Sequence, residues 1–546
     1  MLDEAPNQSP PFVDVNLFAT DTALREAVVR EGAGHAVRQL EEFGALCGSA
    51  EAFEQGRLAN EYPPRLRTHD AQGRRIDFVE FHPAYHACMA QSMGAGLHCG
   101  SWERSGNSAL AVNVARAAAF YMTAQMEAGH CCPITMTNAA VPTLRLQPEI
   151  ADEWVPRILS RDYDPTFRPA AEKSSITIGM GMTEKQGGTD VRANTTRAEP
   201  VASGGPGGEY ILTGHKWFFS APMSDAFLVL AQTRGGLSCF FVPRHLPDGT
   251  INALRLQRLK DKLGNRSNAS AEVEFHGAHA WLIGEEGRGV PAIIEMVTYT
   301  RLDCAVSSAG LMRLALAMAV HHAQHRSVFG RKLIDHALMT QVLADMALDV
   351  EAATALVFRL ARSFDHPEDV RAAAWRRLMT PVTKFWVCKV APMMVGEAME
   401  CLGGNGYVEE HGLARIYREV PVNSIWEGSG NVMALDVLRV LQKEPEVAQI
   451  VMHELAEGVA DDRKLEAAYE RLVGLLHDPR MLDVRARELT ELMALTAAGM
   501  ILRSQGDTDV ADAFISTRLS GPPNQTYGQG LERANTTAIL RRVLPS

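Results

Sequence analysis

The segment with the clearest chemical potential surrounds a single carboxylate and runs from Asn423 to Asn431, reading NSIWEGSGN. Glu427 follows two large apolar side chains, Ile425 and Trp426, and precedes glycines that let the backbone approach a ligand closely. A carboxylate held against such side chains is partly desolvated, and desolvation raises the pKa of a carboxyl group toward the range of a general base. The segment therefore indicates either a catalytic base or, as the alternative, a turn glutamate beside an exposed tryptophan.

Two further segments have side chains suited to binding a ligand. Gly181–Asp190 places hydroxyls and backbone amides in a glycine-bearing loop, which could bind a flat polar heterocycle and a pyrophosphate, or could simply join a helix to a strand. Lys216–Ser220 has three consecutive aromatic residues followed by a hydroxyl. Because alternate side chains of a strand point to opposite faces, at least one ring covers something other than the core. An isoalloxazine ring would suit that position, with Ser220 hydrogen-bonded to its reactive edge.

Two other patterns carry less weight. Glu400–Tyr407 contains a glycine run like a phosphate-binding loop, but the run follows a helix instead of a strand, so a Rossmann site is not indicated. His321, His322 and His325 include an i, i+4 pair that could bind a metal from a helix. No HExxH-type glutamate accompanies these histidines. Solvent-facing or packing roles are therefore favoured, and no metal site is predicted.

The composition limits the class of protein. A chain of 546 residues is long enough for several domains, and 46% hydrophobic with 22% charged residues is typical of a soluble globular protein. The nine irregularly spaced cysteines indicate neither a disulfide framework nor a zinc site, so a reducing cytoplasm is expected. No signal peptide is recognised, and charges such as Arg313 interrupt the apolar runs, so no membrane span is predicted. A net charge of −11 still allows a local basic groove.

The elements that must position these segments change in character along the chain. Residues 1 to about 180 are expected to be mostly helix and loop, with clear helical spacing in Ala109–Gln125. From Ile176 to about Trp281, short runs of β-branched and aromatic residues alternate with glycine turns, which predicts an antiparallel barrel or sandwich. The expected strands include Glu209–Leu212, Lys216–Ser220, Phe227–Thr233, Ser238–Val242 and Ala271–Phe275.

A second helical region begins at Pro291. Leu, Met and Ala recur at helical spacing in Arg301–His325, His336–Phe364 and Arg371–Gly403, as in a helical bundle. Amphipathic helices continue after Pro445, and the pattern weakens into a terminal arm after Gly521. The predicted fold class is therefore α+β, mainly α, with a barrel between helical regions.

Together these segments resemble the acyl-CoA dehydrogenase family in order and spacing. The matching segments are Gly181–Asp190, Lys216–Ser220, Arg326–Gly330, Glu400–Tyr407 and Trp426–Gly428. The resemblance runs nearly end to end for a branch of that family associated with protection of DNA against alkylation, to which Leu259–Ser270 looks specific. It implies an N-terminal helical domain at 1–180, an antiparallel β-barrel at 181–290, a four-helix bundle with the catalytic base at 291–445, and an extra C-terminal helical, DNA-binding domain at 446–546.

The resemblance also implies a cofactor, FAD, and a reaction. Glu427 falls on the family's base, which removes the α-proton of an acyl-CoA thioester while the β-hydride passes to the flavin. The implied FAD contacts are Met182, Thr183, Thr189, Trp217, Phe218, Ser220, Arg326, Phe329, Gly403, Gly404, Ser429 and Asn431. Arg326 and Phe329 would reach the FAD of a neighbouring subunit, which implies a homotetramer. His336-Ala337 stands where the family often has a glutamine, which leaves one adenine-side contact in question.

Two functions follow from the resemblance. One is dehydrogenation of a short or branched acyl-CoA, as in an ordinary catabolic acyl-CoA dehydrogenase without DNA binding. The other is a protective flavoprotein that binds double-stranded DNA through Arg439, Lys443 and Arg518, with weak dehydrogenation. For each of these arginines the alternative is a surface residue in an intrahelical ion pair. Acidic residues outnumber basic ones after Pro445, so a DNA groove would require these residues and symmetry mates to converge.

Overall fold

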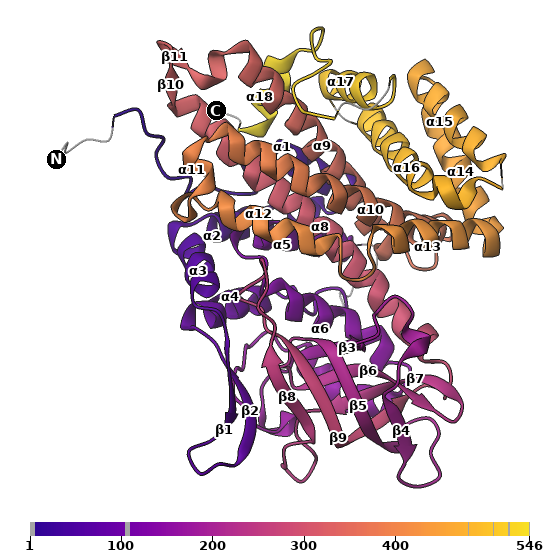
Figure 1. Ribbon diagram of the computed structural model, residues 1–546. Coiled ribbons are helices and arrows are strands. Elements are labelled where there is room, and N and C mark those ends of the chain that lie inside the picture. Colours follow the sequence, from indigo (N-terminus) through magenta and orange to yellow (C-terminus); the bar gives the residue numbers. More distant parts are fainter. Residues whose placement is uncertain (1–5, 104–109, 479, 506, 522–524, 545–546) are drawn as a thin grey trace. The chain divides into compact units, whose positions relative to one another are not determined.

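A computed structural model describes residues 6–103, 110–478, 480–505, 507–521 and 525–544 (Figure 1). The chain forms two compact units, each assembled from separate stretches of sequence. The first contains Met1–Ala50, Asn107–Met126 and Arg301–Ser546, and the second contains Glu51–Gly106 and Glu127–Thr300. The division into four domains stays a prediction.

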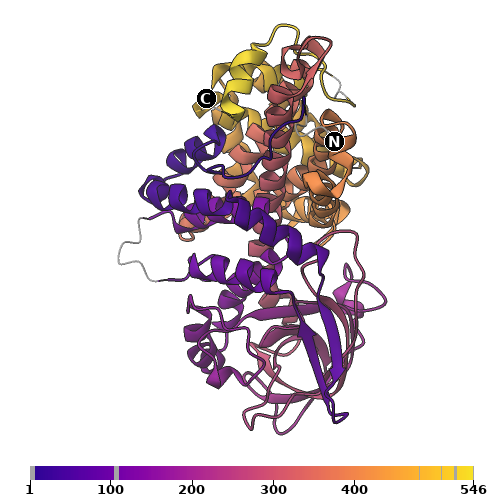
Figure 2. The ribbon, with the colours of Figure 1, turned by 90° about the vertical axis from the view of Figure 1, so that its left-hand side faces the viewer.

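The second unit is built on a closed β-barrel, whose strands curve around a common interior (Figures 1 and 2). The strands hydrogen-bond in the order β3-β5-β4-β6-β7-β9-β8, and the added pairings of β3 with β6 and of β5 with β9 close the sheet. The predicted barrel is confirmed, although β3 and β6 pair in parallel. The strands are β3 (Ile178–Thr183), β4 (Arg197–Pro200), β5 (Glu209–Ser220), β6 (Ala226–Thr233), β7 (Gly236–Pro243), β8 (Leu254–Leu259) and β9 (Ser270–Ile283).

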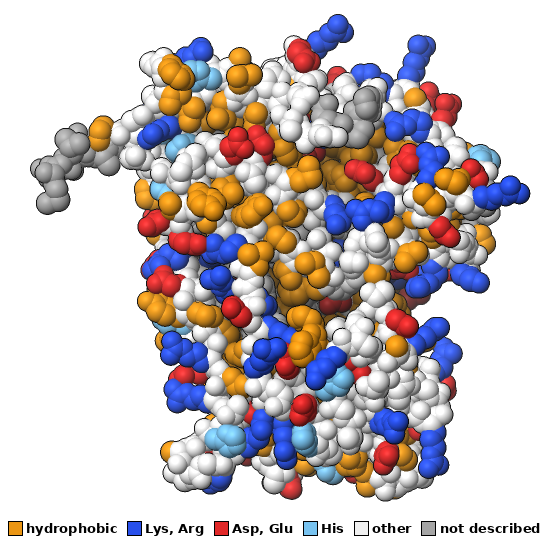
Figure 3. Space-filling model, in the orientation of Figure 1, with side chains coloured by type: hydrophobic (Ala, Val, Ile, Leu, Met, Phe, Trp, Pro, Cys, Tyr) orange, Lys and Arg blue, Asp and Glu red, His pale blue; other side chains and the backbone are white. Residues whose placement is uncertain are grey.

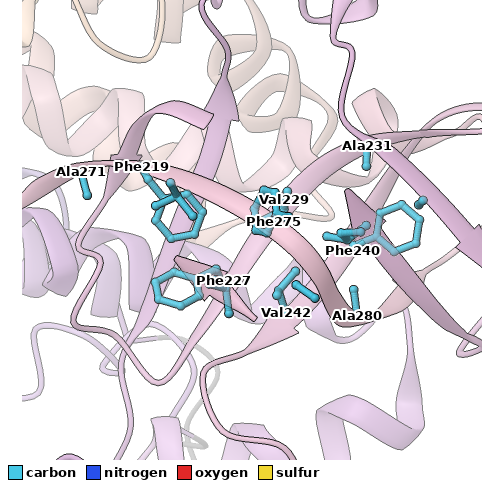
Figure 4. Packing of buried hydrophobic residues seen from close by; sticks show 14 of the residues in the cluster. Phe219, Phe227, Val229, Ala231, Phe240, Val242, Ala271, Phe275 and Ala280 are labelled. Carbon is cyan, nitrogen blue, oxygen red and sulfur yellow. The ribbon is translucent and has the colours of Figure 1, made fainter. Parts of the chain in front are cut away.

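Aromatic side chains fill the barrel interior (Figure 4). Phe219, Phe227, Phe240 and Phe275 are all buried there, and the ring centroids of Phe219 and Phe227 are 4.6 Å apart. Burial of each such ring stabilises the fold by roughly 2 kcal/mol. A Cβ atom on Gly181 would lie 2.3 Å from the Phe219 ring. Strand β3 therefore needs glycine at this position to pack against the core.

One strand of the barrel is longer than the sequence predicted. The strands expected at Glu209–Leu212 and Lys216–Ser220 are a single strand, β5. Its pairing with β9 shifts twice, between Leu212 and Thr213 and again between Lys216 and Phe219. Such bulges bend a strand without ending it, and they break the regular alternation of apolar side chains that sequence reading depends on.

Helices and one hairpin complete the second unit. The helices are α3 (Ala50–Glu61), α4 (Pro83–Gly94), α6 (Cys131–Leu144) and α7 (Pro148–Ile158), with 3₁₀ turns at Ala170–Glu172 and Val191–Ala193. The hairpin of β1 (Arg65–His69) and β2 (Arg75–Glu80) lies in a region expected to be mostly helix and loop. Helix α6 contacts the barrel where the Thr137 hydroxyl accepts a hydrogen bond from the Ile178 N–H, at 3.0 Å.

The first unit consists mainly of helices. They are α1 (Thr22–Arg30), α2 (Val37–Cys47), α5 (Val112–Met126), the Arg301–His325 part of α8 (Gly289–His325), α9 (Ala337–Asp365), α10 (Val370–Cys401), α11 (Gly404–Tyr407), α12 (Leu413–Asn423), α13 (Gly430–Lys443), α14 (Pro445–Val459), α15 (Arg463–Leu476), α16 (Leu482–Gln505), α17 (Thr508–Arg518) and α18 (Thr536–Val543). Strands β10 (Ser327–Val328) and β11 (Arg331–Lys332) form a short hairpin. Turns of 3₁₀ helix occur at Gly34–Ala36, Leu333–Asp335 and Glu409–His411.

Helix α8 packs closely against α5 within this unit. A Cβ atom on Gly310 would lie 2.4 Å from the carbonyl oxygen of Tyr121, so glycine permits the close approach of the two backbones. The buried guanidinium of Arg116 pairs with the buried carboxylate of Asp303 at 2.7 Å. Helix α8 is thus fixed beside α5 by close packing and by a satisfied ion pair.

The terminal arm expected after Gly521 contains a helix, α18, that contacts α9. The Arg542 guanidinium on α18 pairs with Glu351 on α9 at 2.6 Å. Eight residues are too few to give a clear helical pattern in a sequence, which explains the difference from the expectation.

Helix α8 is also long and apolar enough to cross a membrane by length and composition alone, although charges such as Arg313 led to the prediction of no membrane span. Of its apolar window, 89% is buried inside the protein, as in the core helix of a soluble fold.

Candidate active site

Glu427 lies in the loop between α12 and α13, in a backbone conformation that non-glycine residues seldom adopt. Its φ is +58°, and φ of Gly428 is +104°. The indole N–H of Trp426 donates to Asn423 Oδ1 at 3.0 Å, and Asn423 Nδ2 donates to Ser308 Oγ on α8 at 3.1 Å. The start of the loop is therefore fixed to two helices, which can maintain a strained conformation.

Two buried cations bind consecutive carbonyl groups of this loop. Arg301 Nε donates to the Glu427 carbonyl at 3.0 Å, and Lys384 Nζ donates to the Gly428 carbonyl at 2.7 Å. Arg301 also pairs with the buried Asp436 of α13 at 2.7 Å. Hydrogen bonds from charged donors are stronger than neutral ones, so these contacts define the path of the loop.

The carboxylate itself is in a partly desolvated setting. Glu427 Oε2 is buried, whereas Ile425, expected to shield the carboxylate, lies at the surface of the chain. Burial raises the pKa of the Cys304 thiol on α8 well above its ordinary value, the Lys384 ammonium opposes this shift, and the Glu427 carboxylate adds to it. The buried Oε2 shows that the Glu427 carboxylate is partly removed from water, which is the setting that a general base requires.

The other family-implied residues of the helical unit lie in three segments. Ser429 is the N-cap of α13, and the Asn431 side chain accepts a hydrogen bond from Arg487 at 2.9 Å. Phe329, in the turn between β10 and β11, is 97% exposed and has φ of +48°. Beside that turn, Arg326 donates to the carbonyl of Asn7 at 2.7 Å. Gly403, with φ of +59°, precedes Gly404 at the start of α11.

In the barrel unit, the segment Gly181–Asp190 ends β3 and enters a turn with polar contacts. Asn194 Nδ2 donates to the Met182 carbonyl at 3.0 Å. A Cβ atom on Gly188 would lie 2.4 Å from Thr183 Oγ1, so the turn folds back against this hydroxyl. Thr183 is partly exposed and Thr189 is exposed. The segment therefore offers hydroxyls and backbone groups to a ligand.

A buried ion pair connects this segment to β5. Lys216 Nζ and Glu184 Oε1 are 2.9 Å apart, and both side chains are fully buried. Burial by itself raises the pKa of Glu184, but the Lys216 ammonium and hydrogen bonds from Thr195 and Thr196 outweigh burial and lower this pKa to about 2. Burial lowers the pKa of Lys216 to about 8 against the opposing effect of Glu184. The pair fixes Thr183 and Trp217, its chain neighbours, relative to each other.

The aromatic run of β5 points both ways, as its spacing predicted. Phe219 lies in the barrel core, while Phe218 is 49% exposed and Trp217 is partly exposed. Lys260 Nζ lies 3.4 Å from the Trp217 ring centroid and 4.7 Å from that of Phe218. Ser220, partly exposed, pairs with Met180 of β3. Outward-facing rings beside a hydroxyl fit the flat isoalloxazine of FAD.

The residues expected to bind DNA are not equivalent. Arg439 is 65% exposed, with Asp436 of its own helix 3.7 Å away, and Lys443 is exposed in the last turn of α13. Arg518 is only 15% exposed, and its guanidinium pairs with Asp345 at 2.6 Å and with Asp349 at 3.0 Å. A phosphate could reach Arg518 only by displacing two buried carboxylates.

The histidine group on α8 has ordinary hydrogen bonds. His321 Nε2 contacts the Pro10 carbonyl at 2.9 Å, and His322 Nδ1 contacts Ser9 Oγ at 3.0 Å. Among the described residues, no group of three or more His, Cys, Asp or Glu side chains could hold a metal ion.

Sequence reading missed the contacts that support the loop of the base. Arg301 and Lys384 lie in helices whose apolar spacing predicted only a bundle. A charged residue within an otherwise apolar helix predicts a buried polar contact. Such a residue does not indicate which group it contacts.

Comparison with known proteins decides the family. Residues 7–165 match the family described as adaptive response protein AidB N-terminal domain, 179–278 match the acyl-CoA dehydrogenase middle domain, and 287–442 match the acyl-CoA dehydrogenase C-terminal domain. The protein of Escherichia coli (strain K12) named "Putative acyl-CoA dehydrogenase AidB" is 51% identical over 514 residues, which is 94% of either chain. The chain belongs to the acyl-CoA dehydrogenase family. The resemblance to its AidB branch is thereby confirmed.

Acyl-CoA dehydrogenases are FAD-dependent oxidoreductases, and FAD is the cofactor of this chain. The acyl-CoA dehydrogenase family member 11 of Caenorhabditis elegans is 32% identical over 88% of this chain and 79% of its own length. The solved structure of C. elegans ACDH-11 in complex with C11-CoA has a TM-score of 0.86, covering 97% of this chain and 96% of that one, at 28% identity. The apo-form of Bd2924 has a TM-score of 0.83 at 29% identity, covering 91% and 99%. These structures confirm the predicted fold.

Proposed function

We propose that this flavoprotein dehydrogenates an acyl-CoA thioester, with Glu427 as the base that removes the α-proton. The observation that carries the proposal is the strained loop of Glu427, in which two buried cations bind consecutive carbonyls. The C11-CoA complex of ACDH-11 supports a thioester ligand. Cytoplasmic location is part of the proposal, because the irregular spacing of the nine cysteines does not indicate the disulfide framework of a secreted protein.

The chain's own residues have defined tasks in this reaction. An α-proton is a weak acid, so the base must be close and desolvated, as the buried Oε2 of Glu427 permits. The backbone N–H of Glu427 would donate to the thioester oxygen as negative charge develops there. Thr183, Trp217 and Ser220 would orient the flavin. When bound, FAD supplies the ring that accepts the β-hydride.

Anaerobic titration with acyl-CoA tests the proposal. Isovaleryl-CoA or a C11 acyl-CoA should bleach the flavin absorbance of the purified holoenzyme. Glu427→Gln should retain FAD but slow bleaching by at least roughly a thousandfold, because the base is removed while its shape is kept. Glu446→Gln, an exposed residue of α14, is the matched control and should bleach normally. Normal bleaching by Glu427→Gln would show that another group is the base.

We propose as a second function that the protein binds double-stranded DNA and protects it against alkylation. The match to the adaptive response AidB N-terminal domain and the 51% identity to AidB favour this function. Basic and acidic side chains are interspersed on the face shown in Figure 3. This face is not uniformly basic, so DNA binding would depend on particular basic residues. Arg439 and Lys443, both exposed on α13, are the proposed phosphate contacts, while Arg518 is given a structural role.

Duplex binding at several salt concentrations tests the second function. Arg439→Ala and Lys443→Ala should each weaken binding and reduce the slope of log K against log salt by about 1, as for loss of one phosphate contact. Arg480→Ala removes an exposed arginine between α15 and α16 and should leave the slope unchanged. Binding that is absent, or independent of salt, would remove the DNA function while leaving the dehydrogenase proposal intact.

A further inference from the structure

Lys384 is a buried cation to which no role has yet been given in the reaction. It lies in the middle of α10 and is 1% exposed. Removing an ammonium group from water costs several kcal/mol unless strong contacts replace its hydration. Its Nζ donates to the Gly428 carbonyl at 2.7 Å, directly after Glu427. The chain therefore places a costly buried charge at the loop of the base.

The backbone of this loop needs support. A non-glycine residue with positive φ costs of order 1–3 kcal/mol and persists only where surrounding contacts impose it. Glu427 has φ of +58°, and the backbone carbonyls of Glu427 and Gly428 each accept a hydrogen bond from a buried cation. Arg301 binds the first carbonyl and is itself paired with Asp436. Lys384 binds the second.

The charge of Lys384 also lies near the base, because its Nζ contacts the carbonyl of Gly428, the residue that follows Glu427, at 2.7 Å. The Cys304 thiol is influenced by both groups: burial raises its pKa, the Lys384 ammonium lowers it, and the Glu427 carboxylate raises it further. A positive charge near a carboxylate favours the ionised form that can accept a proton. The titratable and charged groups packed around this position are Arg116 of α5, Arg301, Asp303 and Cys304 of α8, Arg377, Lys384, Cys388 and Lys389 of α10, Glu427 in the loop, and Asp436 of α13.

We propose that Lys384 is a positioning residue for the base: it fixes the strained Glu427–Gly428 backbone and places a positive charge beside the Glu427 carboxylate. This inference rests on the proposed dehydrogenase function. It has two separable parts, because the hydrogen bond fixes the loop and the charge acts on the carboxylate.

Hydrogen exchange tests the first part without any turnover. In the FAD-bound holoenzyme, peptides spanning residues 423–431 should exchange at least about tenfold faster in Lys384→Met than in the wild type, and Lys384→Arg should restore slow exchange. Arg371→Met, an exposed position on the same helix, is the matched control and should exchange as the wild type does. Lys384→Gln keeps a donor without the charge, so it should exchange more slowly than Lys384→Met and provides a second variant if the methionine variant does not fold.

The pH dependence of flavin bleaching tests the second part. Loss of the positive charge disfavours ionised Glu427, so the acid limb of the bleaching rate should move to higher pH in Lys384→Gln by about 1 unit, which is about a tenfold slower rate on that limb. Unchanged exchange in Lys384→Met, or an unmoved acid limb in Lys384→Gln, overturns the proposal. If no acyl-CoA bleaches even the wild type, the dehydrogenase function fails, and hydrogen exchange alone then decides the role of Lys384 as a support of the loop.

Discussion

Glu427 has a backbone conformation that costs free energy, and the residue after it shows why the chain tolerates this. Gly428 has φ of +104°, a value that side-chain-bearing residues avoid. A Cβ atom there would lie 2.6 Å from Met433 Cε and 3.0 Å from Val432 Cγ1 on α13. Glycine at position 428 thus allows α13 to begin two residues later, at Gly430. The carboxylate of Glu427 is therefore close in sequence to the N-terminus of this helix.

Gly428→Ala should therefore disturb the base without touching its carboxylate. We expect the substitution to lower the free energy of unfolding by about 1–2 kcal/mol and to slow flavin bleaching by at least about tenfold, because the loop must relax away from its present path. Gly474→Ala is a suitable control, since a Cβ atom there meets nothing within 4 Å on α15, and helix propensity should raise stability by about 0.5–1 kcal/mol. Wild-type bleaching in Gly428→Ala would show that the loop conformation is unimportant.

At the scale of the elements, the Glu184–Lys216 pair joins the end of β3 to β5 inside the barrel unit. Removing one member of a buried pair leaves the other charge unpaired, so Glu184→Gln should lower the free energy of unfolding by about 3–5 kcal/mol. The double variant Glu184→Gln with Lys216→Met should recover much of this loss. Thermal unfolding of the three proteins is the measurement, and equal stability of wild type and Glu184→Gln would contradict the role assigned to the pair.

The same pair gives a pH dependence with a defined sign. The pKa of Glu184 is lowered from 4.5 to about 2 in the folded protein, so its contribution to stability is fully present above pH 4.5 and is lost as pH falls toward 2. The stability difference between the wild type and Glu184→Gln should accordingly shrink over this interval. A difference that stays constant between pH 4.5 and 2 would show that Glu184 is not ionised in the fold.

Helices α9 and α17 are joined by another buried charge network. Arg518 of α17 pairs with Asp345 and Asp349 of α9, and the Tyr527 hydroxyl donates to Asp349 at 2.8 Å. We expect Arg518→Ala to lower the free energy of unfolding by about 3–5 kcal/mol, since it leaves two buried carboxylates without their cation. Arg439→Ala, at an exposed site, should change stability by less than about 0.5 kcal/mol. Measuring both thermal unfolding and DNA binding of each variant distinguishes an arginine that contacts phosphate from one that stabilises the fold. Unchanged stability of Arg518→Ala would contradict the structural role and favour a DNA contact for Arg518.

At the scale of the whole chain, local patterns in the sequence were enough to predict the fold and some of the candidate site residues. The aromatic run of Lys216–Ser220 and the loop around Glu427 were recognisable because their residues are neighbours in sequence. Arg301 and Lys384 were not, because they contact the loop across 126 and 44 residues of sequence. The partners of Arg518, a predicted DNA contact, were not recognisable for the same reason, since Asp345 and Asp349 are on a distant helix. Pairing between helices depends on packing that no single segment encodes.

The exposed side chain of Phe329 bears on how the chains assemble. Phe329 is 97% exposed in a turn at positive φ, and an aromatic side chain so placed gains stability only when a partner covers it. We expect the protein to be a homotetramer in which this turn contacts a neighbouring subunit. Phe329→Asp should then dissociate the assembly and weaken FAD binding together, because burying a carboxylate at the contact is unfavourable. Val201→Asp, an exposed apolar position of the barrel unit, should keep the wild-type mass. Light scattering coupled to gel filtration gives the mass and flavin absorbance gives the occupancy, and a tetramer that survives Phe329→Asp with full FAD would place the subunit contact elsewhere.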